Sequence, residues 1–269
     1  MALPPYIILH KNVGETPLEV LENWRQGTKE ASLVPLAYAG RLDPMAEGKL
    51  LVLIGEECKV QTNYHHLDKE YQTTFVFSLQ SDTGDVLGII TENKPESVSE
   101  NDLKNVLKNL IGEIHFTYPV FSSKTVQGKP LHTWAVEGRL SEITIPTRTS
   151  NLYDISLENL TTISRQELVE KAKAKIAMLP IVTDPKKAIG NDFRRVDVLA
   201  SWNNIAQQGK LDDQFYTADL TITCSSGTYM RTLAEIIATK LGTVGLAMRI
   251  NRTKIGHFNV TNHVWDKLF

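Results

Sequence analysis

The stretch from Tyr38 to Gly55, YAGRLDPMAEGKLLVLIG, constrains this chain more than any other segment. It places one carboxylate, Asp43, in a loop between Gly40 and Pro44, shortly before the apolar run 50–54. Gly40 permits backbone angles that other residues avoid, and Pro44 fixes φ and donates no hydrogen bond. The apolar run predicts a buried strand, so we expect the acid on a rigid turn at its edge. Such loops often carry reactive groups, although Asp before Pro is also an ordinary helix entry.

The residues around Asp43 carry a family resemblance. The loop reads GRLDP over residues 40–44, and the strand after it closes GEECK over residues 55–59. These residues resemble the active-site loop of the TruB family of tRNA pseudouridine synthases. The family pattern is Gly-x-Leu-Asp-Pro, Ala-x-Gly, then an apolar strand that ends Gly-Glu-x-x-Lys. A match this short is weak alone, so the rest of the chain must supply the other family segments in order.

Three later segments match the same family in its order. Residues 224–234 read CSSGTYMRTLA, similar nearly residue for residue to the family's Cys-Ser-x-Gly-Thr-Tyr-Ile-Arg-Ser/Thr-Leu-Ala. Residues 248–258 resemble its Leu-Arg-Arg-Thr-x-x-Gly-x-Phe strand, with Asn251 in place of the first arginine. Residues 118–129 resemble its Pro-Pro-x-Tyr-Ser-Ala-x-Lys-x-x-Gly segment, with the lysine displaced by one position to Lys124. The resemblance therefore covers most of the chain.

Residues 68–88 add another match and one alternative. Lys69 and Tyr71 fit the family's Lys-x-Tyr, and SDTGDVLG is similar to its Thr-Asp-Thr-x-Asp-x-x-Gly. The acids Asp82 and Asp85 also suggest a calcium loop. The segment lacks the alternating ligand series and the distal bidentate Glu of such loops, so we expect no metal here.

The resemblance implies a chemistry and assigns the site residues. Converting uridine to pseudouridine requires an ionised carboxylate in a closed pocket, a cation beside it, an aromatic surface for the base and a way to flip the nucleotide out. Asp43 would be the nucleophile or base, and Arg231, distant in sequence, its guanidinium partner. Tyr71 would stack on the target base and assist proton removal, and Ile250 would line the pocket. No cofactor and no metal are expected.

Two departures from the family pattern bear on RNA binding. Tyr38 stands where the family usually has a histidine that helps to hold the flipped-out RNA, and an aromatic ring there can still stack on a base. Arg41 gives the Arg-Leu-Asp of related rRNA-modifying synthases, in which the arginine fills the space vacated by the flipped base.

Lys124 is the remaining substrate-binding candidate, on an RNA-facing or core-supporting hairpin. The sequence ends soon after Trp265, so we expect no RNA-binding PUA module like that of many bacterial relatives.

Composition favours a cytoplasmic globular protein. No apolar stretch approaches the ~20 residues that span a bilayer, and the first residues do not resemble a secretory signal. Cys58 and Cys224 suit a reducing compartment and offer no metal pair. The net charge of −2 is unusual for an RNA enzyme, so phosphate binding needs a local field. A solvated face is the default interpretation of basic runs, but the C-terminal third concentrates such residues: Arg231, Lys240, Arg249, Arg252 and Lys254.

The apolar segments fit an α+β chain, and the resemblance specifies the pseudouridine synthase fold: a large mixed, mainly antiparallel sheet with flanking helices and a central cleft. We expect one catalytic domain over residues 1–269, with an insertion of unknown purpose around 180–213. The predicted strands are 6–10, 50–54, 72–79, 147–160, 217–223 and 248–258, and the predicted helices are 17–27, 99–110, 131–138, 164–178 and one that ends near 241.

Three hypotheses about function follow. The first is a monomeric tRNA pseudouridine synthase that modifies the uridine at position 55 of the T-loop. The second is the same chemistry on another RNA such as rRNA, which Arg41 and Tyr38 favour. The third is a non-catalytic protein that binds or folds tRNA, against which the joint presence of Asp43, Tyr71 and Arg231 argues. A generic carboxylate hydrolase is disfavoured because no second acid lies in a comparable loop and no glycine-rich phosphate loop is present.

Overall fold

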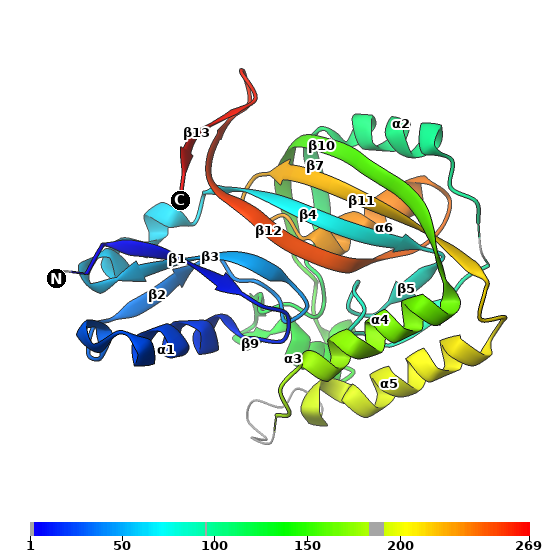
Figure 1. Ribbon diagram of the computed structural model, residues 1–269, viewed down its shortest axis with the longest axis horizontal. Helices are drawn as coiled ribbons and strands as arrows, with labels where there is room; N and C mark the ends of the chain where they lie inside the picture. Colours follow the sequence, from blue (N-terminus) through cyan, green and yellow to red (C-terminus); the bar gives the residue numbers. More distant parts are fainter. Residues whose placement is uncertain (1–2, 95, 183–190) are drawn as a thin grey trace.

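The computed structural model describes residues 3–94, 96–182 and 191–269, whose strands form a large sheet with small hairpins beside it (Figure 1). The strands of the large sheet are β1 (Tyr6–Lys11), β2 (Leu36–Ala39), β3 (Glu47–Ile54), β4 (Asp68–Phe77), β7 (Gly112–Thr117), β10 (Thr147–Ser164), β11 (Gln214–Cys224), β12 (Gly245–Asn259) and β13 (Val264–Leu268). The small hairpins are β5 (Leu79–Ser81) with β6 (Ile90–Glu92), and β8 (Thr125–Val126) with β9 (Lys129–Pro130).

The large sheet brings together strands that are far apart in sequence. Its order is β1-β3-β12-β4-β11-β10-β7, with β2 paired to β3 and β13 to β12. Neighbours along this order are antiparallel except β3 and β12, which run parallel. At this parallel contact Gly48 has a φ of 113°, and a Cβ atom on it would come within 2.4 Å of the Arg252 carbonyl oxygen, so only glycine lets the backbones approach this closely. The sheet confirms the predicted α+β class.

Helices cover the sheet, and several begin at capping residues that the sequence shows. Thr16 forms a capping box with Glu19: its hydroxyl accepts from the Glu19 N–H at 3.2 Å, and its own N–H donates to the Glu19 carboxylate at 2.6 Å. Ser99 and Ser164 cap two others in the simpler way. Over the residues that the structure describes, no helix is both long and apolar enough to cross a membrane. The helices are α1 (Pro17–Gly27), α2 (Glu100–Leu110), α3 (Leu131–Val136), α4 (Arg165–Met178), α5 (Asn191–Gln207) and α6 (Met230–Lys240), with 3-10 turns at Lys29–Ala31, Gly55–Tyr64 and Leu140–Glu142.

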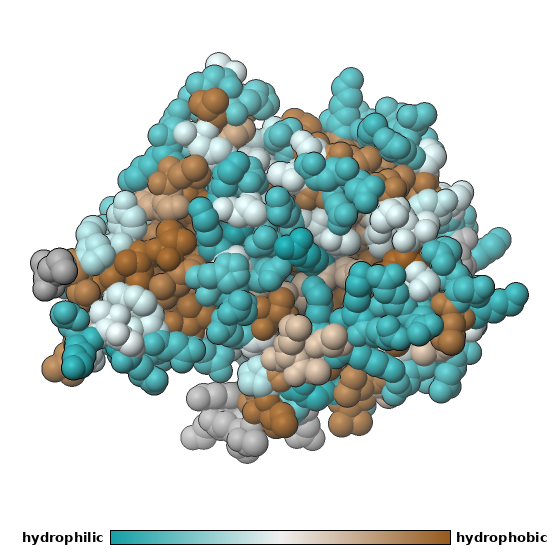
Figure 2. Space-filling model, in the orientation of Figure 1, coloured by the Kyte–Doolittle hydropathy of each residue, from teal (hydrophilic) through white to brown (hydrophobic). Residues whose placement is uncertain are grey.

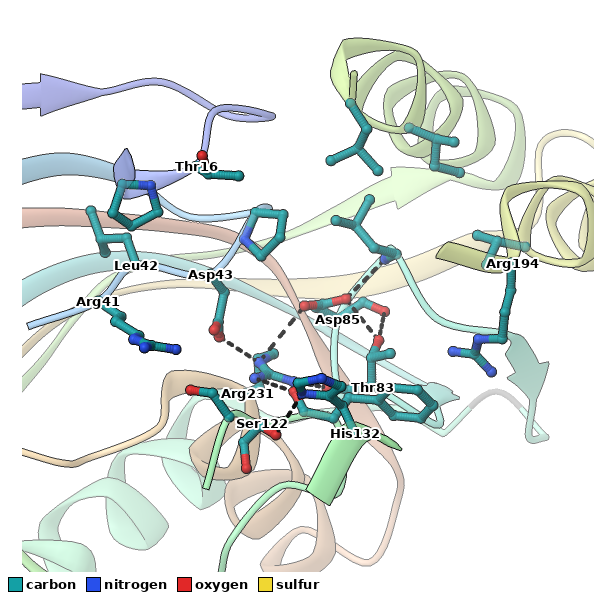
Figure 3. Close-up of a pocket in the computed structure, with 18 of the residues that line it drawn as sticks. Thr16, Arg41, Leu42, Asp43, Thr83, Asp85, Ser122, His132, Arg194 and Arg231 are labelled. Atoms are coloured by element: carbon teal, nitrogen blue, oxygen red, sulfur yellow. Dashed lines mark hydrogen bonds and ion pairs between the residues drawn. The ribbon is translucent and has the colours of Figure 1, made fainter. Parts of the chain in front are cut away.

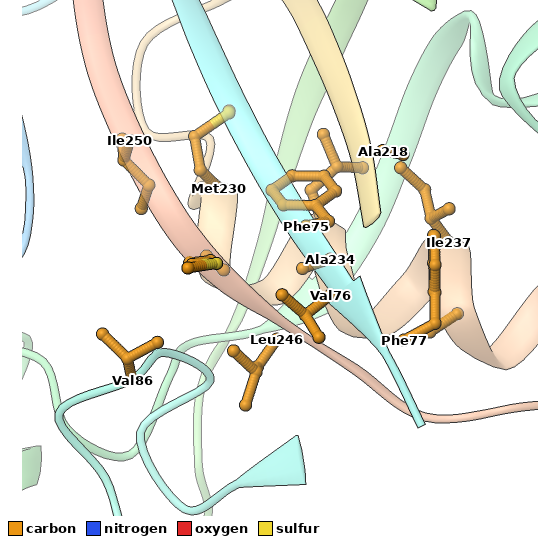
Figure 4. Close-up of a cluster of buried hydrophobic side chains, with 14 of the residues drawn as sticks. Phe75, Val76, Phe77, Val86, Ala218, Met230, Ala234, Ile237, Leu246 and Ile250 are labelled. Carbon is orange, nitrogen blue, oxygen red and sulfur yellow. The ribbon is translucent and has the colours of Figure 1, made fainter. Parts of the chain in front are cut away.

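The main hydrophobic core includes side chains from alternate positions of β4. Phe75 and Phe77 point toward Ile237 of α6, whereas Val76 between them points the other way, beside Leu246 of β12 (Figure 4). This alternation is typical of a strand buried on both faces. α1 covers β1 to β3 over a smaller core, and α4 and α5 pack side by side below the sheet in the view of Figure 1. The candidate site lies between the part of the sheet that α1 covers and the two helices α4 and α5.

Three stretches differ from the sequence-based predictions. Residues 112–117, expected only to end a helix, form β7 and pair with β10, because Ile114 and Phe116 alternate inward. The predicted strand 72–79 stops at Phe77, because Ser78 adopts a φ of 69° and turns the chain into β5. Residues 191–207 lie in the expected insertion, for which no helix was predicted, and form α5. Residues 183–190 of the expected insertion lie outside the described part of the chain.

Candidate active site

Asp43 lies in the turn that connects β2 to β3. Gly40 takes a φ of 87° at its start, and the Ala46 N–H donates to the Asp43 carbonyl oxygen at 3.0 Å. The buried Arg252 of β12 donates to the carbonyl oxygens of Arg41 and Gly40 at 3.1 and 3.2 Å. Hydrogen bonds within the turn and from a side chain at the far end of the chain therefore hold the backbone around Asp43.

Arg231 is the cation beside Asp43. It lies in the first turn of α6, is 3% exposed, and donates from Nε to Asp43 Oδ2 at 2.8 Å (Figure 3). Its Nη1 donates to the Thr83 carbonyl oxygen at 2.6 Å, and its Nη2 to the Phe121 carbonyl oxygen at 3.2 Å. Three chain segments therefore fix all three nitrogen atoms of the guanidinium, and the predicted ion pair is present.

Asp85 is a second acid on the same guanidinium; the sequence placed it in a family-like segment and in a rejected calcium loop, but did not predict it as a site residue. Its Oδ2 lies 3.8 Å from Arg231 Nε, and its Oδ1 accepts from Thr83 Oγ1 at 2.8 Å and from the Leu87 N–H at 2.9 Å. Burial raises the pKa of Asp85, against the opposing effect of Arg231. Burial alone would lower the pKa of Arg231, but Asp43 and Asp85 outweigh it and raise that pKa. The Asp43 side chain is 36% exposed and that of Asp85 6%, so Asp43 is the more accessible of the two acids.

Two hollows meet at Asp43, and we name them by their walls. The helix-side hollow, about 380 Å³, reaches from Asp43 to α4 and α5, and its mainly apolar walls include Leu18, Leu87, Phe121, Ile176, Leu179 and Val198. The sheet-side hollow, about 290 Å³, lies against β4 and β12, and its walls include Lys69, Tyr71, Tyr229, Met230, Ile250 and Arg252. Asp43, Arg41 and Ser122 line both hollows, so the carboxylate can be approached from either side.

The sheet-side hollow contains the residue predicted to stack on the target base and the one predicted to line the pocket. Tyr71 and Ile250 line it, 8% and 4% exposed. Burial raises the pKa of Tyr71, so its phenol stays neutral and can donate a hydrogen bond. Lys69, which sequence reasoning noted only within the Lys-x-Tyr pattern, lines the same hollow and donates to the Leu67 carbonyl oxygen. Burial, reinforced by Arg252, lowers the pKa of Lys69 to about 8, so this amine can exchange a proton near neutral pH.

The three residues predicted to contact RNA are placed differently. Tyr38 lines the helix-side hollow, and Arg41 lines both, with its guanidinium carbon 6.0 Å from the centre of the Tyr38 ring. Lys124 is exposed, lies over the Tyr118 ring at 5.2 Å, and lines neither hollow. The structure therefore brings Tyr38 and Arg41 to Asp43 but not Lys124, and the roles of all three stay predictions.

The basic residues of the C-terminal third do not form the expected positive field. Arg231 and Arg252 are buried and bonded within the protein. Arg249 and Lys254 each pair with a glutamate on a neighbouring strand. Arg231 and Arg252 are therefore not part of a phosphate-facing surface, and for the partly exposed Arg249 and Lys254 that role stays a prediction. A recess beside the site carries positive or titratable side chains from other segments: Arg41, His65, His66 and Arg148.

Metal ligation finds no support within the described ranges, where no group of three or more His, Cys, Asp or Glu side chains is arranged to hold an ion. Asp82 and Asp85 instead bond to their own loop, for example through Asp82 Oδ1, which accepts from the Ile89 N–H at 2.9 Å. The two acids therefore shape the loop.

Comparison with solved structures defines the class of the fold. The chain aligns over 93% of its length with a chain in the crystal structure of a Cbf5–Nop10–Gar1 complex, with a TM-score of 0.52 and 18% sequence identity. It spans 48% of that solved chain, and the likeness concerns the fold alone. The chain shares the fold of that solved chain, and its large mainly antiparallel sheet with flanking helices is the architecture expected from the sequence.

Comparison of sequences shows the family. Residues 30–175, more than half of the chain, match the family described as TruB family pseudouridylate synthase (N terminal domain). The protein belongs to this TruB family and is therefore a pseudouridine synthase, an isomerase. Similar proteins, each named tRNA pseudouridine synthase B, come from Caldicellulosiruptor saccharolyticus (28% identical, covering 94% of this chain and 68% of the relative), Borrelia garinii subsp. bavariensis (28%, 95% and 71%) and Bordetella avium (26%, 96% and 83%).

Proposed function

We propose that the protein converts uridine into pseudouridine in tRNA, at position 55 of the T-loop. The pair of Arg231 Nε and Asp43 Oδ2, 2.8 Å apart where the two hollows meet, carries this proposal. The hollow next to it also holds Tyr71 and Ile250. The similar proteins support tRNA as the substrate, since each is named tRNA pseudouridine synthase B.

The reaction exchanges one bond to the ribose for another. The C1′–N1 bond breaks with its electron pair going to N1, and the uracil rotates. A C1′–C5 bond then forms, C5 loses its proton and N1 takes one up. Asp43 starts this sequence either by attacking C1′ or by removing a proton from C2′, and both routes need its carboxylate ionised. Arg231 orients that carboxylate, balances its charge, and itself stays charged throughout.

The sheet-side hollow receives the uracil in this proposal. The Tyr71 ring offers a stacking surface, and aromatic stacking on a base contributes ~1–3 kcal/mol. Its neutral phenol donates a hydrogen bond to the base, because burial raises the phenol's pKa. Lys69, with a pKa of about 8, is a group in the same hollow able to carry a proton during the exchange at C5 and N1.

RNA reaches this site with the target nucleotide out of its stack, since the carboxylate lies inside a hollow. The recess lined by Arg41, His65, His66 and Arg148 adjoins the site and shares Arg41 with it. These side chains supply a local positive field although the chain has a net charge of −2.

The test is tritium release from RNA labelled at C5 of uridine, because that hydrogen leaves when C5 bonds to C1′. A tRNA T-loop hairpin is the substrate, and an rRNA hairpin of equal length is the second arm. We expect release from the T-loop hairpin, its loss in Asp43→Asn, and normal release in Asp154→Asn, which removes an exposed acid from β10 as a matched control. Release that survives Asp43→Asn would remove Asp43 from the mechanism. Release from rRNA alone would change the substrate, and binding without release would favour a tRNA-binding protein.

A further inference from the structure

α4 and α5 pack against each other, and α5 packs against β6 (Figure 1). α5 buries Val198 and Trp202, which are 2% and 0% exposed. At the start of α4, the buried Arg165 pairs with Glu92 at the end of β6, with Nη2 2.8 Å from Oε1. The two helices therefore form one block seated on the loop between β5 and β6, residues 82–89, which we call the Asp82 loop.

Two buried side chains of α5 bond to the backbone of this region. Trp202 Nε1 donates to the Val86 carbonyl oxygen at 3.0 Å, and Ser201 Oγ accepts from the Ile90 N–H at 3.1 Å. Breaking a buried hydrogen bond leaves a polar group unsatisfied, which costs about 1–3 kcal/mol, so α5 holds the Asp82 loop firmly. Thr83 in this loop provides one of the carbonyl oxygens that accept from Arg231.

Arg194 of α5 connects the Asp82 loop to the other segment that holds Arg231. Both of its Nη atoms donate to the Asp82 carboxylate, with Nη2 3.3 Å from Oδ1. Its guanidinium carbon lies 4.3 Å from the centre of the Phe121 ring. The carbonyl oxygens of Phe121 and of Thr83, the neighbour of Asp82, accept from Arg231 Nη2 and Nη1. One side chain thus contacts both segments that orient the guanidinium at the site.

We propose that Arg194 is a positioning residue for Arg231: by bridging Asp82 and Phe121, it holds in place the carbonyl oxygens that aim the guanidinium at Asp43. This role rests on the proposed function, because it concerns the cation that serves the reacting acid. Arginine suits the place because its planar group can pair with a carboxylate at its edge while its face lies on an aromatic ring.

The geometry indicates the size of the effect. Arg231 makes hydrogen bonds of 2.8 Å and 2.6 Å to Asp43 and Thr83, so a shift of the Asp82 loop moves the guanidinium relative to the carboxylate. A displacement of about 1 Å in a reacting site can reduce turnover on the order of 10²-fold. The Arg194 side chain is 17% exposed and that of Asp82 is 36% exposed, so water weakens this ion pair in part, and the contact of Arg194 with the Phe121 ring adds a second attachment.

The experiment compares Arg194→Gln with Arg139→Gln. Arg139 is a matched control, because it also pairs with acids and lies over an aromatic ring, Trp134 at 5.0 Å, but bonds to neither segment that holds Arg231. A second variant, Trp202→Phe, keeps a buried aromatic ring but removes the indole hydrogen bond and part of the ring volume. Each protein is measured for kcat and KM on the T-loop hairpin, for its Kd for that hairpin, and by ¹H–¹⁵N spectra of the arginine Nε–H groups.

We expect kcat to fall about 10- to 100-fold in Arg194→Gln and Trp202→Phe, with KM and Kd within about twofold of wild type. The Arg231 Nε–H resonance, assigned with Arg231→Lys, should shift and exchange faster with water in these two variants and stay unchanged in Arg139→Gln. An unchanged kcat, a rise in KM alone, or an unmoved Arg231 resonance in Arg194→Gln would overturn the proposal. The spectra need no substrate, so a wild-type chain without turnover would refute the proposed function and leave the positioning role decided by the resonance.

Discussion

Two arginines are buried alike and held by the same kinds of group, yet only one of them lies at the candidate site. Arg231, 3% exposed, is held by two aspartates and two backbone carbonyl oxygens. Arg165, 2% exposed, is held by Glu92, Asp213 and two backbone carbonyl oxygens. The difference is open space: Asp43 borders two hollows, and neither Glu92 nor Asp213 lines either one.

This comparison separates a buried ion network from a reactive site. Buried arginines with two acids are common structural devices, because the charges need partners once they leave water. A site also needs an acid that is paired on one side and accessible on the other. Arg165 ties α4 to β6, to α5 and to Asp213 and lines neither hollow, whereas Arg231 leaves Asp43 open to both.

Replacing Arg231 should have the largest effect on turnover. Arg231→Gln removes the charge beside Asp43, and we expect kcat to fall about 10³-fold or more, because this preorganised cation faces the reacting acid. Single-turnover assays on the T-loop hairpin measure it, with circular dichroism to confirm folding. A folded variant with kcat within tenfold of wild type would break the distinction between the two arginines.

Replacing Arg165 should act on stability instead. Arg165→Gln leaves Glu92 without its buried partner, and we expect the free energy of unfolding to fall by about 3 kcal/mol or more. Urea unfolding measures this loss, and kcat per folded molecule should stay close to wild type. A loss of turnover beyond the unfolded fraction would contradict the comparison, by showing that Arg165 also acts on the site.

Lys69 differs from both arginines, because this buried cation bonds to a carbonyl oxygen rather than to an acid. Burial lowers its pKa from 10.5 to about 8, so between these values the folded protein binds fewer protons than the unfolded one. The charged amine therefore destabilises the fold below pH 8, and this penalty disappears as the pH rises toward 10.5. Relative to wild type, Lys69→Met should be more stable at pH 7 than at pH 10 by about 3 kcal/mol. Urea unfolding of both proteins at the two pH values measures it, and a pH-independent difference would refute the lowered pKa.

The second acids of the two networks should show the smallest effects. Asp85→Asn keeps the shape of the side chain and an oxygen for Thr83 and Leu87, so we expect kcat to fall only about tenfold. Asp213→Asn should leave kcat unchanged and lower the free energy of unfolding by about 1 kcal/mol, since its carboxylate is 37% exposed. Measuring kcat and urea unfolding for both variants in parallel gives the loss of turnover and the loss of stability of each. An equal fall in kcat in the two variants would contradict the difference between the Arg231 and Arg165 networks.

Much of the site could be predicted because its residues lie in short local patterns. Gly40 and Pro44 fix the turn of Asp43, and Arg231 follows a motif at the start of a helix. Helix limits followed from caps such as Thr16 and Ser99, whose hydrogen bonds reach only three residues along the chain. These features depend on neighbours in sequence, so the sequence shows them directly.

The remaining parts depend on contacts that no local pattern encodes. Asp85 matters because its carboxylate lies 3.8 Å from Arg231, a distance fixed only by the complete fold. Trp202 and Arg194 act on a distant loop, one of them through a backbone carbonyl that any residue could offer. The helical spacing of Val198, Trp202 and Ile205 was nevertheless a signal for α5 that could have been recognised.

The place of β12 in the sheet order determines when the enzyme can begin to work. β12 lies between β3 and β4, and it carries the Arg252 that fixes the turn of Asp43. Until residues 245–259 leave the ribosome, the strands on either side have nothing to join them, so we expect the nascent chain to hold two unconnected sheets. Catalytic competence would then arise in one step when β12 is translated, rather than grow with the length of the polypeptide.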